Sequence, residues 1–246
     1  MLVILPPSET KSDGGEAAPL DLDSLVLPEL NPVRRKLAEA IVDLSADLDA
    51  SRTALGLGAT AVAEIERNAD LWESPTRTAI TRYTGVLYDA LDYPGMTRAA
   101  KTKAGDRLMI GSALFGVVRA DDRIPAYRLS GGSRLPGFGT LGALWKPVLS
   151  PALDRIDDFV VDLRSGVYQK LGPVDGAVTA TVVTEAADGS RKVVSHFNKH
   201  FKGLVARELV RTRRNARDVN ALAAVLSDAG QRVEITSESQ ITVVTG

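Results

Sequence analysis

The first half of the chain has the pattern of one strand followed by helices. Leu2–Leu5 is apolar throughout and ends at Pro6 and Pro7, which predicts a buried strand that leads into a loop. An acidic loop follows over 13–23, after which apolar residues recur at the helical period. We expect helices over 32–48, 59–71 and, after the N-cap Ser74, 75–91.

In the second half, short β-rich runs alternate with helical patterns. We predict strands over 108–110, 126–129, 159–163, 178–183, 192–196, 232–236 and 241–245. Helices are predicted over 141–153, 198–214 and 218–229, the last between an Asp218 N-cap and Gly230. The N-terminal strand has to pair with later strands. We therefore expect one compact mixed α/β domain over 1–246, with an N-terminal array of helices.

Basic residues are concentrated near the C-terminus of a nearly neutral chain. The 246 residues have a formal net charge of -1, yet 191–217 contains nine basic residues and one acid, Glu208. Leu204, Val205, Leu209 and Val210 recur on one helical face, and arginines lie on another. Such a segment is typical of either an ordinary solvated amphipathic helix or a surface that binds an anionic partner such as nucleic acid. The cations predicted to contact DNA are Lys199, Lys202, Arg207, Arg211 and Arg214.

Composition excludes several classes of protein. The chain has no cysteine, which excludes disulfides, zinc thiolate sites and thiol catalysis. Its apolar stretches are too short for a signal sequence or a membrane span, so we expect a cytoplasmic protein without membrane contact. His196 and His200 have the spacing of two metal ligands on a helix, but the basic residues around them disfavour a cation. We predict no metal and no cofactor.

A glycine-containing turn between two helical patterns lies within about 51–70. Gly56 and Gly58 alternate with leucines there, as in a helix-hairpin-helix element, whose backbone amides bind phosphate. The alternative is an ordinary glycine cap and a tight interhelical turn.

Residues 137–142 spell GxGxxG, but 130–136 separate them from the preceding strand pattern. We interpret this motif as a glycine-rich loop rather than as a dinucleotide site. The chain has neither a GxSxG nor a GxxxxGK[ST] motif.

Four ordered blocks carry a family resemblance. The run 112–129, SALFGVVRADDRIPAYRL, resembles the peroxide stress protein YaaA family, and so do the blocks TGVLY at 84–88, DLRSGVYQK at 162–170 and SHFNK at 195–199 with the basic residues after it. The resemblance implies one compact α/β protein with a helix-hairpin-helix, a positively charged cleft, DNA binding and a role in limiting oxidative damage. The chain departs from the family pattern at LPPSETK, where Glu9 stands in place of a lysine and Lys11 follows two residues later.

Three functions are compatible with these residues. The first is binding of duplex DNA through its backbone, with low sequence specificity, in the peroxide stress response. The second is an enzyme that acts on a nucleotide- or nucleobase-like molecule in a polar pocket. That pocket would be lined by Tyr127, Arg128, Ser165, Tyr168, Lys170 and Lys199. A protein-interaction module is a third reading, in which the basic segment is a docking face.

Overall fold

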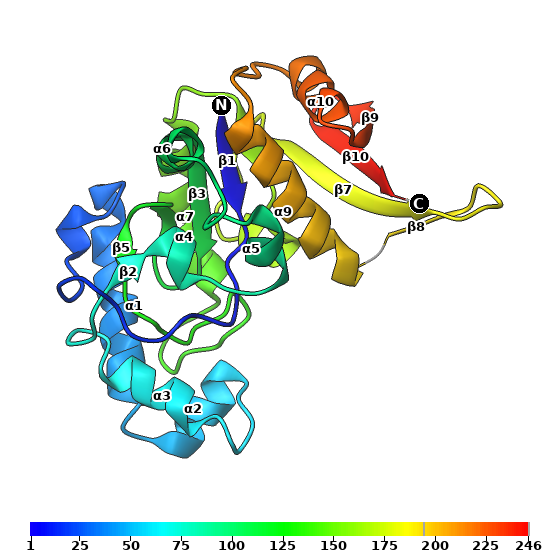
Figure 1. Cartoon of the computed structure of the whole chain (residues 1–246). Coiled ribbons are helices and arrows are strands. Elements are labelled where there is room, and N and C mark those ends of the chain that lie inside the picture. The colour runs from blue at the N-terminus through cyan, green and yellow to red at the C-terminus, as the bar shows by residue number, and fades with distance from the viewer. Residues whose placement is uncertain (194, 246) are drawn as a thin grey trace.

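The computed structural model describes residues 1–193 and 195–245, and is built on an eight-stranded sheet (Figure 1). The strands follow the order β4-β3-β1-β6-β7-β10-β9, with β8 paired to β7. They are β1 (Leu2–Leu5), β3 (Leu108–Ser112), β4 (Gly116–Arg119), β6 (Val160–Asp162), β7 (Val178–Glu185), β8 (Arg191–Val193), β9 (Arg232–Ser237) and β10 (Gln240–Thr245). A two-stranded sheet pairs β2 (Arg77–Thr78) with β5 (Arg123–Ile124).

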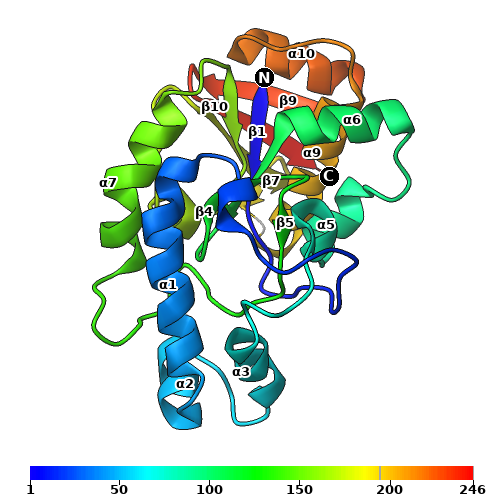
Figure 2. The ribbon, with the colours of Figure 1, turned by 90° about the vertical axis from the view of Figure 1, so that its left-hand side faces the viewer.

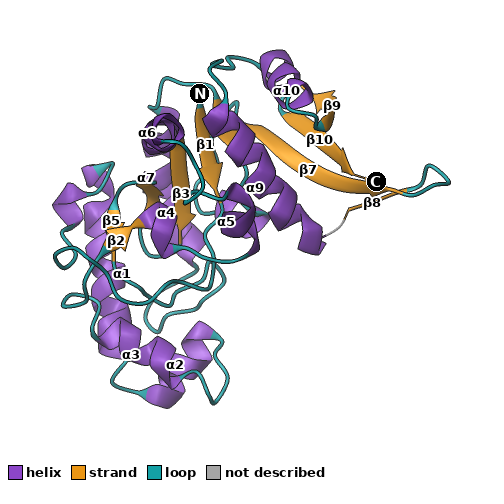
Figure 3. Ribbon diagram, viewed as in Figure 1, coloured by secondary structure: helices purple, strands orange, loops and turns teal. Residues whose placement is uncertain are grey.

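Helices cover both faces of the large sheet. Figure 2 shows α1 and α7 on one side and α5, α6 and α9 on the other, while α2 and α3 extend below the sheet as a hairpin. The α-helices are α1 (Asn31–Leu44), α2 (Leu48–Leu55), α3 (Val62–Ala69), α4 (Ala79–Arg82), α5 (Val86–Leu91), α6 (Arg98–Arg107), α7 (Leu141–Asp154), α8 (Gly166–Gln169), α9 (Ser195–Arg211) and α10 (Val219–Asp228). Figure 3 separates these helices from the strands and loops.

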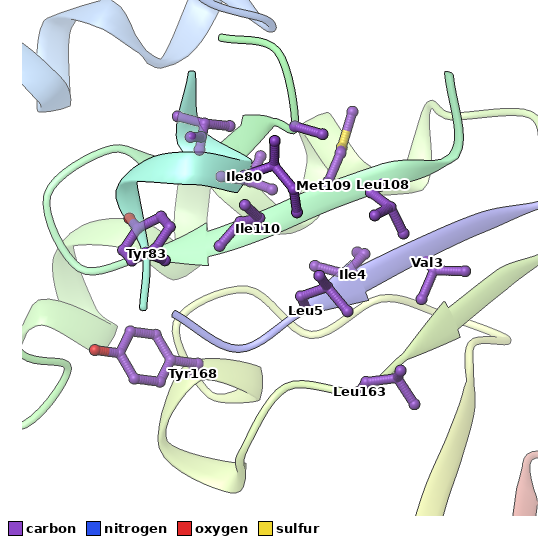
Figure 4. Packing of buried hydrophobic residues seen from close by; sticks show 14 of the residues in the cluster. Val3, Ile4, Leu5, Ile80, Tyr83, Leu108, Met109, Ile110, Leu163 and Tyr168 are labelled. Atoms are coloured by element: carbon purple, nitrogen blue, oxygen red, sulfur yellow. The ribbon is translucent and has the colours of Figure 1, made fainter. Parts of the chain in front are cut away.

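The central strand β1 is buried along its whole length. It pairs in parallel with β3 on one side, where Val3 lies opposite Leu108, and with β6 on the other, where Val3 lies opposite Val161. A strand with helices on both faces needs apolar side chains in both directions, which explains why Leu2–Leu5 does not alternate with polar residues. Figure 4 shows this core with Val3, Ile4 and Leu5 packed among the side chains of β3 and α4.

The predicted class, a compact mixed α/β domain, is confirmed. The strand pattern at the N-terminus and those that became β3, β6, β7, β9 and β10 are confirmed with shifts of a few residues. The C-terminal helix α10 also has its predicted ends, because Asp218 accepts a hydrogen bond from the Ala221 amide and Gly230 has φ +83°.

The single helix predicted over 75–91 is wrong. Residues 77–78 form strand β2, and the helical part is divided into α4 and α5. Gly85 lies at the division with φ +99°, a conformation that ends one helix and reorients the chain before the next. The helix predicted over 32–48 is also divided, since α1 ends at Leu44 and Asp47 caps α2.

The strand predicted over 126–129 is also wrong. These residues run as a loop, and Tyr127 and Leu129 are buried in the core rather than paired in a sheet. Near 192–196 the strand β8 ends at Val193 and α9 already begins at Ser195, so α9 starts and ends three residues before the predicted 198–214. Helix α6 and strand β4 were not predicted at all, because α6 has little apolar periodicity and β4 lies inside a continuous apolar run.

Within residues 1–193 and 195–245, no helix has both the length and the apolar character needed to cross a membrane.

Candidate functional site

The carboxyl ends of β1 and β6 lie side by side at a change of direction in the sheet. The next strand of the large sheet after β1 is β3, which pairs with β1 on one side. The next strand after β6 is β7, which pairs with β6 on the opposite side. At such a point the following loops diverge and leave a crevice, which is where open α/β sheets bind ligands. Here the crevice lies between Pro6–Glu9, which follow β1, and Leu163–Ser165, which follow β6.

Three neighbouring cavities occupy this crevice, and Glu9 lines all of them. The first, of about 640 Å³, lies between the β6 end and the start of α9. The second, of about 530 Å³, lies between Pro6–Thr10 and α5. The third, of about 500 Å³, lies between the 128–134 loop and the end of α2. We call the three together the cleft. Each has the size of a small-molecule site.

Cations outnumber acids around the cleft. Lys199 lines the first and second cavities, and Arg128 lines the third. The Arg128 guanidinium lies 3.3 Å from the Glu9 carboxylate. Among residues 1–193 and 195–245, Glu9 is the one acidic residue that lines any of the three cavities. The cleft is therefore suited to a ligand with negative charge.

Helix α3 holds Arg128 in place. The Asn68 carboxamide accepts a hydrogen bond from the Arg128 amide at 2.7 Å and donates one to its carbonyl at 2.9 Å. Asn68 is buried, so this pair of bonds fixes the backbone of the loop from which the guanidinium extends.

Apolar side chains are exposed along the same cleft. Five large apolar side chains are exposed in the described part of the chain, and three of them line the cleft. Val167 and Val193 line the first cavity, and Val86 lines the second. Exposed apolar groups gathered beside cations are typical of a ligand that has an apolar body and a charged group.

Buried tyrosines lie beyond the end of β1. Figure 4 shows Tyr83 and Tyr168 past the carboxyl end of the strand. The Tyr127 hydroxyl lies 2.8 Å from the Tyr83 hydroxyl and 2.7 Å from Ser112 Oγ, which accepts a hydrogen bond from the Phe115 amide. Burial raises the pKa of Tyr83 to about 12 and that of Tyr127 well above its ordinary value. Both hydroxyls therefore keep their protons near neutral pH.

The first cavity has a rigid wall built on a buried ion pair. The Arg164 guanidinium lies 2.8 Å from the Asp162 carboxylate and donates further hydrogen bonds to the carbonyls of Tyr168 and Gly172. Lys202, from α9, donates to the carbonyls of Leu163 and Arg164 at 3.0 and 3.3 Å. Burial lowers the pKa of this lysine, and nearby Asp162 opposes the shift.

The structure brings together most of the residues predicted for a pocket. Ser165, Tyr168 and Lys199 line the first cavity, and Arg128 lines the third. Tyr127 is buried behind them in the core. Lys170 is exposed at the end of α8 and lines none of the three cavities.

The arginines predicted to contact DNA lie elsewhere and have acidic neighbours. Arg207 lies 3.1 Å from Asp92, Arg211 lies 3.6 Å from Glu208, and Arg214 lies 2.6 Å from Asp228. Asp92 and Asp228 come from other parts of the chain. The nine-to-one excess of basic residues in 191–217 is thus partly neutralised in the folded protein.

The predicted hairpin has two helices joined by a turn, and its glycines differ from each other. Gly56 has φ +64° and ends α2, with its amide donating to the Arg52 carbonyl. This is an ordinary glycine cap. Gly56 also lines the third cavity, whereas Gly58 does not. The cap accounts for the turn, and a phosphate-binding role for these glycines stays a prediction.

Sequence reasoning did not select Glu9 or Lys11 as site residues. Both lie in the LPPSETK block that follows the first apolar run. The signal was available in the pattern, because polar residues directly after a buried parallel strand lie at the edge where ligands bind.

The spacing of His196 and His200 suggested two metal ligands on one helix. The His196 side chain lies outside the described part of the structure. Among the side chains that are described, no group of three or more His, Cys, Asp or Glu is arranged to hold an ion.

Comparison with known proteins identifies relatives of this sequence. A family model described as peroxide stress protein YaaA matches residues 1–233. A UPF0246 protein of Corynebacterium efficiens is 50% identical over 240 residues, covering 96% of this chain and 95% of that protein. UPF0246 proteins of Corynebacterium glutamicum (strain ATCC 13032) and Streptomyces coelicolor are 46% and 42% identical over 239 residues. They cover 95% of this chain, and 95% and 92% of their own lengths.

Proposed function

Starting from the fact that this chain belongs to the peroxide stress protein YaaA family, we propose that it is an enzyme that acts on a nucleotide- or nucleobase-like molecule held in the cleft. Its cellular role would then be to process such a molecule during peroxide stress. The ligand would carry a flat apolar body and an anionic group. Lys199 and Arg128 would hold the anion, and Tyr168 with the valines of the first cavity would contact the body.

One observation carries this proposal: at the switch point of the sheet, exposed valines line the same cavities as Lys199, which forms no ion pair within the described part of the chain. A surface that only follows a phosphate backbone needs cations and amides, and gains nothing from exposed Val86 and Val167. A heterocyclic ring held in either cavity, in contrast, would cover the valine that lines it and remove apolar surface from water. The volumes of the first and second cavities, about 640 and 530 Å³, also suit a molecule of this size better than a duplex.

A thermal-shift screen of nucleobases, nucleosides and nucleotides tests the proposal. We expect at least one nucleotide to raise the melting temperature, and Lys199→Ala and Arg128→Ala to remove most of that shift. Losing one charged contact of this kind costs about 2–5 kcal/mol of binding free energy. Lys146→Ala is the matched control, because Lys146 is exposed on α7 and lines none of the cavities.

Val167→Asp provides a second readout, since it places a negative charge, which repels an anionic ligand, in the first cavity and removes an apolar contact there. It should weaken binding of the same nucleotide by about tenfold or more. A shift that survives all three cleft variants, or that Lys146→Ala also removes, would contradict a site in the cleft. The absence of any shift across the three compound classes would contradict the proposed ligand class.

Duplex DNA remains a second candidate, and the position of the hairpin favours it. The end of α2, including Gly56, forms part of the third cavity together with Arg128 and Arg134. A nucleic-acid strand that crossed this turn would therefore lie at the mouth of the cleft. Engagement of about five phosphates would give a slope near -4.5 for log K against log salt.

Fluorescence anisotropy with a labelled duplex tests this candidate. The double variant Gly56→Asn, Gly58→Leu should weaken binding if backbone amides of the turn approach phosphate. Asparagine tolerates the positive φ at position 56, and a side chain at position 58 meets open space, so the variant should stay folded. Unchanged affinity in a folded double variant would mean that the turn is only a connection between helices.

A further inference from the structure

Lys11 lies directly after the wall that the three cavities share. Residues Pro6–Thr10 line the cleft, and Lys11 is the next residue in the chain. Its ammonium lies 4.2 Å from the centre of the Tyr127 ring and 5.4 Å from that of Tyr83. Part of the side chain remains exposed. Lys11 itself lines none of the three cavities, but its ammonium bonds to the carbonyl of Ser8, which lines the second cavity. The nitrogen thus packs against aromatic rings and lies next to the wall of the cleft.

The hydrogen bonds of this ammonium are weak for a buried charge. Lys11 Nζ donates to the carbonyls of Ser8 and Glu9 at 3.2 and 3.4 Å, at or beyond the long end of the usual range for such bonds. No carboxylate in the described part of the chain lies within ion-pair distance of it. The rings of Tyr83 and Tyr127 favour the cation, but their hydroxyls bond to each other and to Ser112 instead.

Charged neighbours act on the Lys11 amine in both directions, and burial has the largest effect on its state. Glu9 on its own loop and Glu64 on α3 favour the charged form, while Arg128 and Arg67 oppose it. Burial, the largest effect, lowers the pKa of Lys11 to about 8. A substantial fraction of the side chain is therefore a neutral amine near physiological pH.

We infer that Lys11 is the reactive amine beside the cleft and that the nucleotide-like anion it meets carries, in addition, an aldehyde or ketone group, with which the amine condenses to an imine. A lysine desolvated against apolar rings and close to other cations is how proteins prepare a nucleophilic amine. Arg128 and Lys199 would hold the anionic group while the carbonyl reaches Lys11 along the Glu9 wall. This inference rests on the proposed function, because it requires that the cleft binds a small anion.

The chemistry balances without any further reactant. The nitrogen lone pair of the neutral amine forms a bond to the carbonyl carbon, and the carbonyl oxygen takes up a proton to give a carbinolamine. Loss of the hydroxyl group with the remaining amine proton releases one water molecule and leaves a carbon–nitrogen double bond. Both hydrogens of the amine end in that water, and no oxidant or reductant is consumed.

Pyridoxal 5′-phosphate serves as an anionic aldehyde probe for the unliganded protein, with borohydride to fix the imine and peptide mapping to locate it. Lys36 is the matched control, because it also lies over an aromatic ring, 5.2 Å from the centre of Phe138, but is exposed. We expect Lys11 to be labelled about ten times faster than Lys36 at pH 8, with a rate midpoint near pH 8. Lys11→Arg keeps a cation over the rings. It should abolish labelling at position 11 and leave the labelling of Lys36 unchanged.

Two outcomes would overturn the inference: labelling of Lys11 no faster than that of Lys36, or a midpoint close to the ordinary value of 10.5. Tyr127→Phe keeps the ring and should leave the midpoint unchanged, which separates desolvation by the ring from any effect of the hydroxyl. If Tyr127→Phe moves the midpoint to the ordinary value, the ring does not cause the shift and the inference fails.

Uncharged pyridoxal separates the failure of this inference from that of the proposed function. If the cleft holds the anion, the phosphate probe should label Lys11 faster than pyridoxal does, and Lys199→Ala should remove that preference. Fast labelling of Lys11 without a preference would support a reactive amine and argue against the anion site. A nucleotide shift in the thermal screen with an inert Lys11 would keep the proposed function and remove the imine.

Discussion

The cleft and the C-terminal half of α9 both contain cations, but the number of acids beside those cations differs. In the cleft, Glu9 is the one acidic lining residue of the described chain and lies 3.3 Å from Arg128, whereas Lys199 forms no ion pair with any described acid. In the C-terminal half of α9 and the residues after it, Arg207, Arg211 and Arg214 each lie beside an acid.

A count of charges along a sequence therefore does not predict the electrostatic field at the protein surface. Asp92 and Asp228 are distant in sequence from the arginines that they neutralise, and only the fold brings them together. Four predictions test whether the two regions differ as described, in order of expected effect.

The largest effect is expected where a charge of the cleft wall is buried. Arg164→Met should destabilise the protein by about 3–5 kcal/mol, because it leaves Asp162 buried without its partner and two carbonyls without a donor. Arg214→Met, in an exposed pair, should cost no more than about 1 kcal/mol. Urea unfolding of both variants measures the contrast, and equal costs would remove the distinction between the two regions.

The next effect concerns how α9 is held against α5. A Cβ at Gly203 would lie 2.3 Å from the Leu87 carbonyl oxygen and 2.8 Å from the Ala90 Cβ. Gly203→Ala should therefore cost about 1–3 kcal/mol and displace Lys199 and Lys202 from the cleft.

Gly142→Ala is the helical control for this prediction. Its Cβ would meet nothing closer than 3.7 Å, so the substitution should be neutral or slightly stabilising. Calorimetry measures the stability of both variants. A Gly203→Ala protein as stable as the wild type would mean that α9 and α5 tolerate separation.

Stability should also depend on pH through Lys11. Its pKa in the folded protein is about 8, below the ordinary 10.5, so between these values the unfolded chain binds more protons than the folded one. The free energy of unfolding should therefore rise with pH from about 8, by about 1.5 kcal/mol up to pH 9.5. The raised pKa values of Tyr83 and Tyr127 act in the opposite direction, but only above about pH 10, where unfolded tyrosines ionise.

Denaturant titrations at several pH values measure this rise. Lys11→Met should remove it, whereas Lys36→Met should retain it. A wild-type protein whose stability is flat or falls between pH 8 and 9.5 would contradict a desolvated amine at this position.

The smallest effect is expected for the paired arginines. If the neighbouring acids neutralise these arginines, Arg207→Ala, Arg211→Ala and Arg214→Ala should each change DNA affinity little. If each instead meets a phosphate, each variant should lower the salt slope by about one. Anisotropy titrations over a range of salt concentrations distinguish the two results, and a drop of this size in all three variants would restore the basic segment as a DNA-binding face.

The sequence was most informative where one side-chain pattern has one structural solution. Leu2–Leu5 could only be a strand buried on both faces, and Asp218 with Gly230 bounds α10 by local hydrogen bonding and backbone conformation. The strand prediction over 126–129 was wrong for the opposite reason. Tyr127 and Leu129 are buried in the core although they belong to a loop. In the sequence, the apolar pattern of such a buried loop cannot be told from that of a strand.

The candidate site was predictable in its membership but not in its geometry. The family-like blocks contained Arg128, Ser165, Tyr168 and Lys199, and these residues do line the cleft. Their meeting with Glu9 depends on the parallel pairing of β1 with β6, which are more than a hundred residues apart in the chain. No local pattern encodes that pairing, or the burial that changes the state of Lys11.

The pairing of β1 also has a consequence for the order of folding. Strand β1 needs partners at 108–110 and 160–162, so one of its edges stays open until β3 has been made and the other until β6 has been made. Contacts this distant in sequence form slowly, because a long loop has to close before any pairing is gained. The cleft begins at the end of that strand, so it is among the last parts of the molecule to be completed. A chain arrested before β6 would expose an apolar strand and have no ligand site to stabilise it.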